Sequence, residues 1–383
     1  MAEFLFWLLT GVVLYTFFGY AGLIALLARC CPRPARCAPI TPSVALLILA
    51  YNEEDVIAAK LENSLQLDYP RELLRIIVVA DGSDDATVAI AQRYVGQGVA
   101  VWHQPARRGK VAAMNRAVPL LDSEIVVFTD ANAMLNRDAL RALACHFVDP
   151  QVAIVTGERR VRGGGEGLYW RYESYLRRCD DRFGSTMGAV GELFAIRRAL
   201  YQPPPEDTID EDFYLSMHLV AAGWRIAYAL EAVAIEEPSR FLADDWERRA
   251  RISAGGFQAI ARLPEMLDPR LGRVAWQYVS HRLLRWVAPL LLPLILLLSL
   301  TLTDRPFYQL VLGGQLAFYG AGLAGYWRAR RGHRHGLLYV IFHFCMVCLA
   351  DIVGFWRWVT GRQPVTWAKA RRNKQRSHDK ATA

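Results

Sequence analysis

Three short runs of β-type apolar residues are each followed, within two residues, by an acidic or amide side chain. The runs cover 44–50, 74–80 and 125–129, and the side chains that follow them are Asn52, Asp81 and Asp130. A fourth acidic position, Asp212, opens a stretch with helical character. Open α/β sheets hold nucleotides and their metal ions with polar groups at the carboxyl ends of successive buried strands. The pattern therefore predicts an α/β nucleotide-binding sheet.

Strand and helix patterns alternate from about residue 41 to residue 235, which is typical of βαβ units in a sheet. The predicted strands are 44–50, 74–80, 99–103, 124–129, 152–161 and 191–196, and the predicted helices are 53–67, 84–94, 109–118, 137–147 and 168–183. Each predicted helix separates two predicted strands, so we expect a Rossmann-like fold with helices packed on the sheet.

Apolar segments flank this α/β region and predict a membrane protein. The segment Phe4–Ala28 has no charged residue and exceeds the roughly 20 apolar residues that span a bilayer. A cleaved signal peptide is the alternative, but no basic residue precedes the segment and its apolar core is too long. Three more apolar runs follow the α/β region, at Val287–Thr303, Phe307–Trp327 and Leu337–Trp356.

The net charge of +8 is concentrated beside the apolar segments. From Arg357 onward the chain has eight Lys and Arg residues against Asp379 alone. Positive charge next to membrane spans indicates the cytoplasmic side, so we expect a cytoplasmic catalytic domain and no nucleic-acid partner. Four spans would place the basic tail on the opposite side from that domain. One run therefore fails to cross fully, and Leu337–Trp356 and Val287–Thr303 are the two candidates.

The sequence predicts five regions along the chain. They are an N-terminal transmembrane anchor (1–40), a catalytic α/β domain (41–238), two amphipathic interface helices (239–286), a C-terminal transmembrane region (287–358) and a basic tail (359–383). Basic and aromatic residues interleave in the third region, which favours helices at headgroup depth, although a solvated basic helix has the same composition.

Seven cysteines show no CxxC metal pair in a soluble setting and no spacing typical of a disulfide framework, and Cys345 and Cys348 lie in an apolar run where they suit packing. Cys30, Cys31 and Cys37 are expected to be reduced thiols, with acylation at the membrane edge as the alternative.

The strand-end residues suit the chemistry of a sugar diphosphate. A hard cation such as Mg²⁺ or Mn²⁺ takes few protein carboxylates, and Asp130, with Asn132 on the same turn, supplies oxygens for it. Asp81 is placed to accept hydrogen bonds from a base or ribose, and Lys110 is placed to reach a phosphate. Asp212 is the predicted base that deprotonates an acceptor hydroxyl. Taken singly, these acidic residues also suit turns and helix N-termini.

Five motifs in order, AYNEE, VVADGSDD, RRGKVAAMN, FTDAN and IDED, resemble those of membrane-bound family 2 glycosyltransferases with the GT-A fold. Among these enzymes the chain is most similar to bacterial exopolysaccharide and poly-N-acetylglucosamine-type synthases. The resemblance implies inverting, metal-dependent transfer from a UDP-sugar. It assigns donor binding to six positions: Asn52, Glu53, Asp81, Lys110, Asp130 and Arg251.

Two departures from the family pattern concern the metal and the acceptor. The family's DxD motif has Asn132 at its third position here. The family's QxxRW motif aligns with residues 248–252, where Arg251 is kept but Arg248 replaces Gln and Ile252 replaces Trp. The missing Trp removes a stacking platform for a sugar ring, and Trp286 is either its substitute or an interfacial anchor.

Four residues are predicted to contact the acceptor: Trp170, Glu192, Glu211 and Arg248. Trp170 also suits a core helix, and Glu192 also suits a local ion pair with Arg197 or Arg198.

The resemblance predicts a multi-pass enzyme of the bacterial inner membrane that transfers a sugar to a lipid-linked or growing saccharide in exopolysaccharide synthesis. Membrane lipids and other exopolysaccharide assembly subunits are its expected partners. A polyprenyl-phosphate sugar transferase and a non-catalytic membrane scaffold are the alternatives.

Overall fold

The computed structural model describes residues 1–162, 167–237 and 241–366. The chain divides into two compact units. The helical unit comprises Met1–Pro32, Gly164–Phe183 and Asp245–Gln363, and the sheet unit comprises Arg33–Gly163, Gly184–Asp244 and Pro364–Ala383. Residues 167–183, which the sequence prediction places in the catalytic domain, group with the flanking apolar segments. Most of the predicted basic tail, 359–383, lies outside the described residues.

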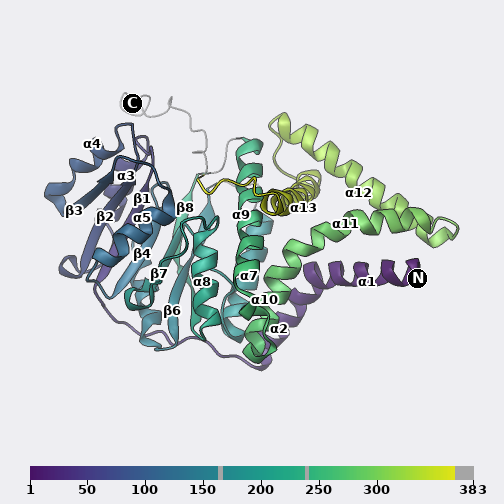
Figure 1. Ribbon diagram of the computed structural model, residues 1–383, viewed down its shortest axis with the longest axis horizontal. Coiled ribbons are helices and arrows are strands. Elements are labelled where there is room, and N and C mark those ends of the chain that lie inside the picture. The colour runs from purple at the N-terminus through teal and green to yellow at the C-terminus, as the bar shows by residue number, and fades with distance from the viewer. Residues whose placement is uncertain (163–166, 238–240, 367–383) are drawn as a thin grey trace. The chain divides into compact units, whose positions relative to one another are not determined.

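An eight-stranded mixed sheet is the centre of the sheet unit within the described residues, with strand order β3-β2-β1-β4-β7-β6-β8-β5 (Figure 1). The strands are β1 (Val44–Ala50), β2 (Leu74–Asp81), β3 (Val99–Gln104), β4 (Ile125–Asp130), β5 (Met134–Leu135), β6 (Val152–Val161), β7 (Leu193–Arg197) and β8 (Arg225–Glu236). Strands β3, β2, β1 and β4 are parallel, whereas β7 is antiparallel to both β4 and β6. The predicted α/β sheet is confirmed.

The register brings the predicted site residues to one edge of the sheet. Ala50 at the end of β1 pairs with Ala80 of β2, and Leu49 pairs with Asp130 of β4. Because these strands are parallel and end level with one another, the residues that follow them converge. Strands β5 and β8 were absent from the sequence prediction.

Helices of the sheet unit pack on the two faces of the sheet. They are α3 (Ile57–Leu65), α4 (Thr87–Gln92), α5 (Lys110–Ala117), α6 (Ala139–Ala144) and α8 (Glu211–Ala221). Side chains alternate between the faces of a strand. Leu46 and Ile48 therefore share one apolar cluster with Leu61 of α3 and Leu140 of α6.

Helices make up the helical unit. They are α1 (Ala2–Leu14), α2 (Tyr20–Cys30), α7 (Gly167–Phe183), α9 (Leu242–Arg262), α10 (Arg273–Tyr278), α11 (Leu284–Thr301), α12 (Pro306–Arg330) and α13 (Leu337–Val359). A π-helical turn, Tyr15–Gly19, joins α1 to α2, and another, Val279–Leu283, joins α10 to α11. Within this unit α2 packs on α7, α1 on α11, and α12 on α13.

Short 3-10 turns complete the described secondary structure. They are Arg71–Leu73, Val95–Gln97, Val118–Leu120, Cys145–Val148, Arg198–Leu200, Pro264–Leu267 and Pro269–Leu271.

Three helices of the described chain are long and apolar enough to cross a membrane: Ala2–Cys30, Arg273–Thr301 and Leu337–Val359. The predicted second interface helix is thus continuous with the apolar helix that follows it. The run that does not reach this criterion is Phe307–Trp327 in α12. Both candidates that the sequence suggested for incomplete crossing meet it.

Cys37 and Cys145 form a disulfide in the sheet unit, so the expectation of a reduced thiol at Cys37 was wrong. The segment before β1 lies along the 3-10 turn Cys145–Val148, where the Ala38 N–H donates to the carbonyl of Cys145 at 3.2 Å. Because the two cysteines are 108 positions apart in the sequence, no local spacing predicts the pair.

Candidate active site

Asp81, at the end of β2, organises the loop that leads into α5. Its Oδ2 accepts hydrogen bonds from the N–H groups of Arg108 (2.9 Å) and Gly109 (2.7 Å). Its Oδ1 is buried, has no hydrogen-bond partner among the described residues, and lies 3.6 Å from Arg116. Asp81 therefore shapes the loop with one oxygen and keeps the other as an acceptor.

Gly82 lets this loop approach the end of β2. Its φ is +70°, and a Cβ at this position would lie 2.6 Å from the backbone nitrogen of Arg107. Glycine has no Cβ and adopts positive φ readily, so it is suited to this close contact.

Asn52 links the ends of β1 and β2. Its φ of 55° is left-handed, a conformation that asparagine tolerates better than most residues. Its side chain accepts from the N–H of Asp84 at 3.0 Å and donates to the Asp84 carboxylate at 2.6 Å. The N–H of Glu53 donates to Thr87 at 2.7 Å. These contacts give Asn52 and Glu53 a role in positioning the site, and direct donor binding by either stays a prediction.

Lys110 connects β4 to α8. Its ammonium lies 2.9 Å from Asp130 Oδ1 and 2.9 Å from Glu211 Oε1. Burial disfavours the charged ammonium, but Asp130, Glu211 and Asp212 together hold the pKa of Lys110 well above its usual range. Lys110 thus brings the predicted metal ligand and the predicted base cluster into one chain of contacts.

The surroundings of Asp130 suit a divalent cation. Burial raises the pKa of Asp130, and the nearby charges of Glu192 and Glu236 raise it further, against the opposing effect of Lys110. Asn132 donates its side-chain N–H to Glu236 at 2.7 Å, which leaves its oxygen as a ligand. Mg²⁺ and Mn²⁺ prefer oxygen ligands, and a cation beside Asp130 would offset the two carboxylates that raise its pKa. Asp130 and Asn132 therefore fit a metal.

Glu192 lies in a buried ion network with Arg159 and Glu236. The Arg159 Nε is 3.0 Å from Glu192 Oε1 and 2.7 Å from Glu236 Oε2. The sequence analysis offered Arg197 or Arg198 as a local ion-pair partner of Glu192, and this alternative was wrong, because the partner is Arg159. Arg197 donates instead to the carbonyls of Phe147 and Val152, both at 2.7 Å.

Asp212 lies in the first turn of α8, beside Asp210 and Glu211. Burial, followed by the charges of these two neighbours, raises the pKa of Asp212 well above its usual range. Gly191 leaves room for this carboxylate, because a Cβ at Gly191 would lie 3.0 Å from Asp212 Oδ2. Glu211 has Lys110 as its partner, and its predicted acceptor contact stays a prediction.

Three predicted site residues belong to the helical unit: Trp170 on α7, and Arg248 and Arg251 on α9. Their predicted contacts with donor and acceptor stay predictions.

Trp286 is a buried packing residue of the helical unit. It is 8% exposed, and a Cβ at Gly256 would lie 2.4 Å from its ring. Phe257 packs beside it, with ring centroids 6.3 Å apart. Of the two alternatives for Trp286, an interfacial anchor does not fit this burial.

Lys60 is a site residue that the sequence prediction missed. It is fully buried, and its ammonium donates to Thr129 Oγ1 at 2.9 Å and to the carbonyl of Ala133. These two residues flank the predicted metal ligands. A signal was present, because Lys60 shares the apolar face of α3 with Ile57, Leu61 and Ser64 at helical spacing.

The mixed sheet, the carboxylates at its strand ends and the acidic first turn of α8 define a glycosyltransferase of the GT-A fold. The family model described as "Glycosyltransferase like family 2" matches residues 42–255, and the chain belongs to this family. The predicted resemblance is confirmed at this level.

Similar proteins differ in the substrates that their names give. A β-monoglucosyldiacylglycerol synthase of Nostoc sp. is 27% identical over 307 residues, which cover 76% of this chain and 66% of that protein. A poly-β-1,6-N-acetyl-D-glucosamine synthase of Staphylococcus aureus is 28% identical over 232 residues, which cover 57% of this chain and 56% of that protein. The chain thus spans about half to two thirds of the length of these relatives.

A solved mannosyltransferase from Pyrobaculum calidifontis, in complex with GDP-Man and Mn²⁺, has a similar fold. It superposes with a TM-score of 0.76 and 23% identity, over 94% of this chain and 100% of that one.

Proposed function

We propose that this protein transfers a hexose from a UDP-sugar, with inversion at the anomeric carbon, to a hydroxyl group of a membrane-bound acceptor. One observation carries the proposal. Lys110 contacts both Asp130 and Glu211, and so links the predicted metal ligand to the acidic cluster that contains Asp212.

The donor's nucleotide is assigned to the end of β2. Asp81 Oδ1 is a buried acceptor with no hydrogen-bond partner within the described chain, and it suits the imide N–H of a uracil base. Asn52 holds the neighbouring loop, and Lys110 supplies positive charge for the diphosphate. The choice of uridine rests on the motif resemblance, since guanine also offers a ring N–H.

A divalent cation, Mg²⁺ or Mn²⁺, would be held by Asp130 and Asn132 and would stabilise the negative charge of the departing diphosphate. Lys110, which contacts Asp130, would add a second positive charge beside the departing diphosphate.

Asp212 is the proposed general base. The acceptor oxygen forms a bond to the anomeric carbon, the bond from that carbon to the diphosphate oxygen breaks, and UDP leaves. The hydroxyl proton passes to Asp212. Its raised pKa in the absence of ligands increases its affinity for this proton, and positive charge bound nearby keeps the carboxylate ionised before transfer.

The acceptor is proposed to be a lipid-linked or growing saccharide of exopolysaccharide synthesis, held close to the membrane. A second candidate is a lipid hydroxyl, as in diacylglycerol. The match to the Nostoc synthase favours this candidate, because that match takes in 76% of this chain and therefore extends beyond residues 42–255, which the family model matches.

The enzyme is proposed to be a multi-pass protein of the cell membrane. Three crossing helices would return the C-terminal tail to the side of the catalytic domain. The positive charge beside the spans then places both on the cytoplasmic side.

The test is a nucleotide-release assay with the purified full-length protein in detergent. UDP- and GDP-hexoses are supplied with Mg²⁺, Mn²⁺ or EDTA, and the acceptors are membrane lipid extract, diacylglycerol and polyprenyl phosphate. We expect metal-dependent UDP release with an acceptor that carries a hydroxyl group. Release only from GDP-hexoses would refute the donor assignment, and no release from any donor would refute the function.

A further inference from the structure

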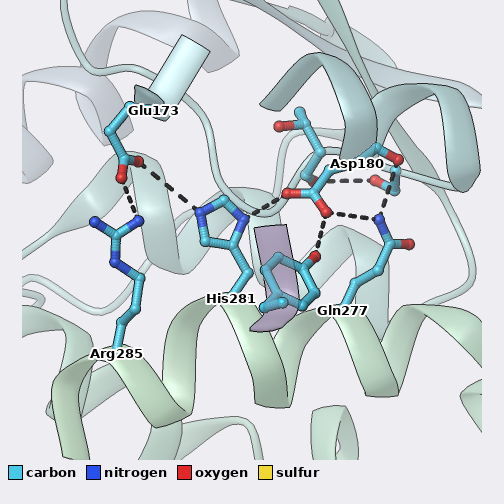
Figure 2. A network of polar contacts seen from close by, with 8 residues as sticks. Glu173, Asp180, Gln277, His281 and Arg285 are labelled. Atoms are coloured by element: carbon cyan, nitrogen blue, oxygen red, sulfur yellow. Dashed lines mark hydrogen bonds and ion pairs between the residues drawn. The ribbon is translucent and has the colours of Figure 1, made fainter. Parts of the chain in front are cut away.

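A buried polar network joins three segments of the helical unit: α2, α7 and the π-helical turn before α11. Figure 2 shows His281 between two carboxylates of α7, Asp180 and Glu173. His281 Nδ1 lies 2.5 Å from Asp180 Oδ2, and both residues are 0% exposed. A network this deep needs its charges balanced, since an unpaired buried charge is costly.

Asp180 has partners for both carboxylate oxygens. Gln277 donates to its Oδ1 at 3.1 Å, Tyr20 donates its hydroxyl to the same oxygen, and His281 contacts Oδ2 (Figure 2). Asp180 is therefore fully occupied within the network.

Glu173 is also occupied. It pairs with Arg285 through Oε1, and its Oε2 lies 3.9 Å from His281 Nε2. Burial alone would raise the pKa of Glu173, but Arg285 and His281 hold it well below its usual range. Neither carboxylate of the network is left for another cation.

The same cluster contains more positive than negative charge. Arg282, on the π-helical turn, interacts electrostatically with Arg177, Arg285, Glu173 and Asp180. This set contains three guanidinium groups, those of Arg177, Arg282 and Arg285, and two carboxylates. The difference is one positive charge with His281 neutral, and two when it is protonated.

Arg177 is the guanidinium with an unsatisfied buried donor. Its Nε is buried and has no hydrogen-bond partner within the described residues, although the side chain as a whole is half-buried. Arg282 adds a like charge beside it. An anion bound here would satisfy the buried Nε–H and relieve the repulsion.

The position of the cluster along the chain indicates headgroup depth. Arg282 and Arg285 come directly before the apolar stretch that begins at Val287, within the candidate span Arg273–Thr301. Trp276, on the preceding turns, donates its indole N–H to Tyr15 of the first candidate span at 3.1 Å. Trp, Tyr and Arg together are typical of the membrane interface.

We propose that Arg177 and Arg282 form a binding site for the phosphate group of a membrane lipid. Guanidinium groups bind phosphate oxygens through paired hydrogen bonds, and basic pockets between membrane helices bind anionic headgroups. The π-helical geometry supports a specialised role, because π-helical turns inside longer helices occur frequently at functional sites. The phosphate belongs either to a bilayer phospholipid or to a lipid-phosphate acceptor, and the experiment separates these sources.

The experiment measures the melting temperature of the purified full-length protein in a neutral detergent as lipid is added. Phosphatidylglycerol, phosphatidylcholine, polyprenyl phosphate and inorganic phosphate are compared. We expect a rise with phosphatidylglycerol or polyprenyl phosphate. If polyprenyl phosphate saturates the rise at a concentration at least tenfold lower than phosphatidylglycerol does, the phosphate belongs to the acceptor. If polyprenyl phosphate binds as tightly as phosphatidylglycerol or more weakly, the phosphate belongs to a bilayer phospholipid. No rise with either lipid, or an equal rise with inorganic phosphate, overturns the lipid site.

The variant Arg177→Gln separates this site from a merely structural role. Without lipid it should melt at the same or a higher temperature than the wild type, because a repulsive charge has been removed. With lipid it should lose most of the rise, whereas Arg177→Lys should keep part of it. Arg178→Gln, an exposed neighbour on the same helix, is the matched control and should keep the full rise. Equal loss in Arg178→Gln, or a full rise in Arg177→Gln, would overturn the site.

Discussion

The ammonium nitrogen of Lys110 lies 2.9 Å from Asp130 Oδ1, so the residue predicted to bind phosphate contacts the residue predicted to bind the metal. A second contact, to Glu211, extends this pair to the acidic turn that contains Asp212. Lys110 therefore competes with a cation for Asp130 and also supplies charge to the donor site. These two effects act in opposite directions when Lys110 is removed.

Lys110→Met should raise the KM for the UDP-sugar and lower the metal concentration needed for half-maximal activity. The lost charged contact corresponds to about 1.5–3 kcal/mol, or roughly 10- to 150-fold in kcat/KM. Activity titrations with Mn²⁺ and with donor measure both changes. Lys110→Arg keeps the charge and serves as the control. A parallel weakening of metal and donor would contradict the competition between Lys110 and the cation.

Asp212→Asn tests the general base. Transfer to a hydroxyl acceptor should fall by roughly 10²–10⁴-fold, while UDP binding measured by calorimetry stays within about twofold. Asp122→Asn removes an equal charge from an exposed pair with Arg75 and should leave transfer unchanged. If Asp212→Asn keeps substantial transfer to polyprenyl phosphate, the acceptor is a phosphate group, which needs no base.

Gly191→Ala should reduce kcat by about tenfold with little change in KM. The new Cβ would lie 3.0 Å from Asp212 Oδ2, and misplacing a catalytic group by a fraction of an ångström is costly to the rate. Steady-state kinetics with the purified enzyme measure the two constants separately. Gly96→Ala is the matched control, because no atom lies within 4 Å of its new Cβ. An equal effect of both substitutions would show that Gly191 has no special relation to Asp212.

Local pattern was sufficient to predict the parallel half of the sheet. The runs in β1, β2 and β4 are largely apolar; β2 and β4 end at Asp81 and Asp130, and β1 ends two residues before Asn52. β8 was missed because polar residues interrupt it, as Glu231 does, and its pairing with β6 has register shifts.

Partners distant in sequence were the part of the site that the sequence could not predict. The Arg159–Glu236 pair joins residues 77 positions apart, and neither has a helical or strand period that points to the other. Glu192 was recognised as a site candidate, but its partner lies on β6, which is adjacent to β7 only through antiparallel pairing. The burial of Lys60 could have been predicted, because its place on the apolar face of α3 is visible in the sequence, but the sequence prediction missed it.

Lys60 should make the stability of the protein rise with pH above neutrality. Burial lowers the pKa of its ammonium from 10.5 to about 7 in the folded protein. Between these two pH values the unfolded chain binds more protons, so the free energy of unfolding increases as pH rises from 7 toward 10.5. Below pH 7 both states are protonated and Lys60 adds no slope. The full range corresponds to at most about 5 kcal/mol, at 1.36 kcal/mol per pKa unit.

Melting temperatures of the wild type and Lys60→Met measure this effect from pH 6 to pH 10 in detergent with EDTA. EDTA is included because a cation at Asp130 would add its own charge near Lys60. The wild type should gain stability relative to Lys60→Met as pH rises above about 7, and the difference should be constant below that pH. Curves that remain parallel from pH 6 to pH 10 would show that Lys60 is not the titrating group.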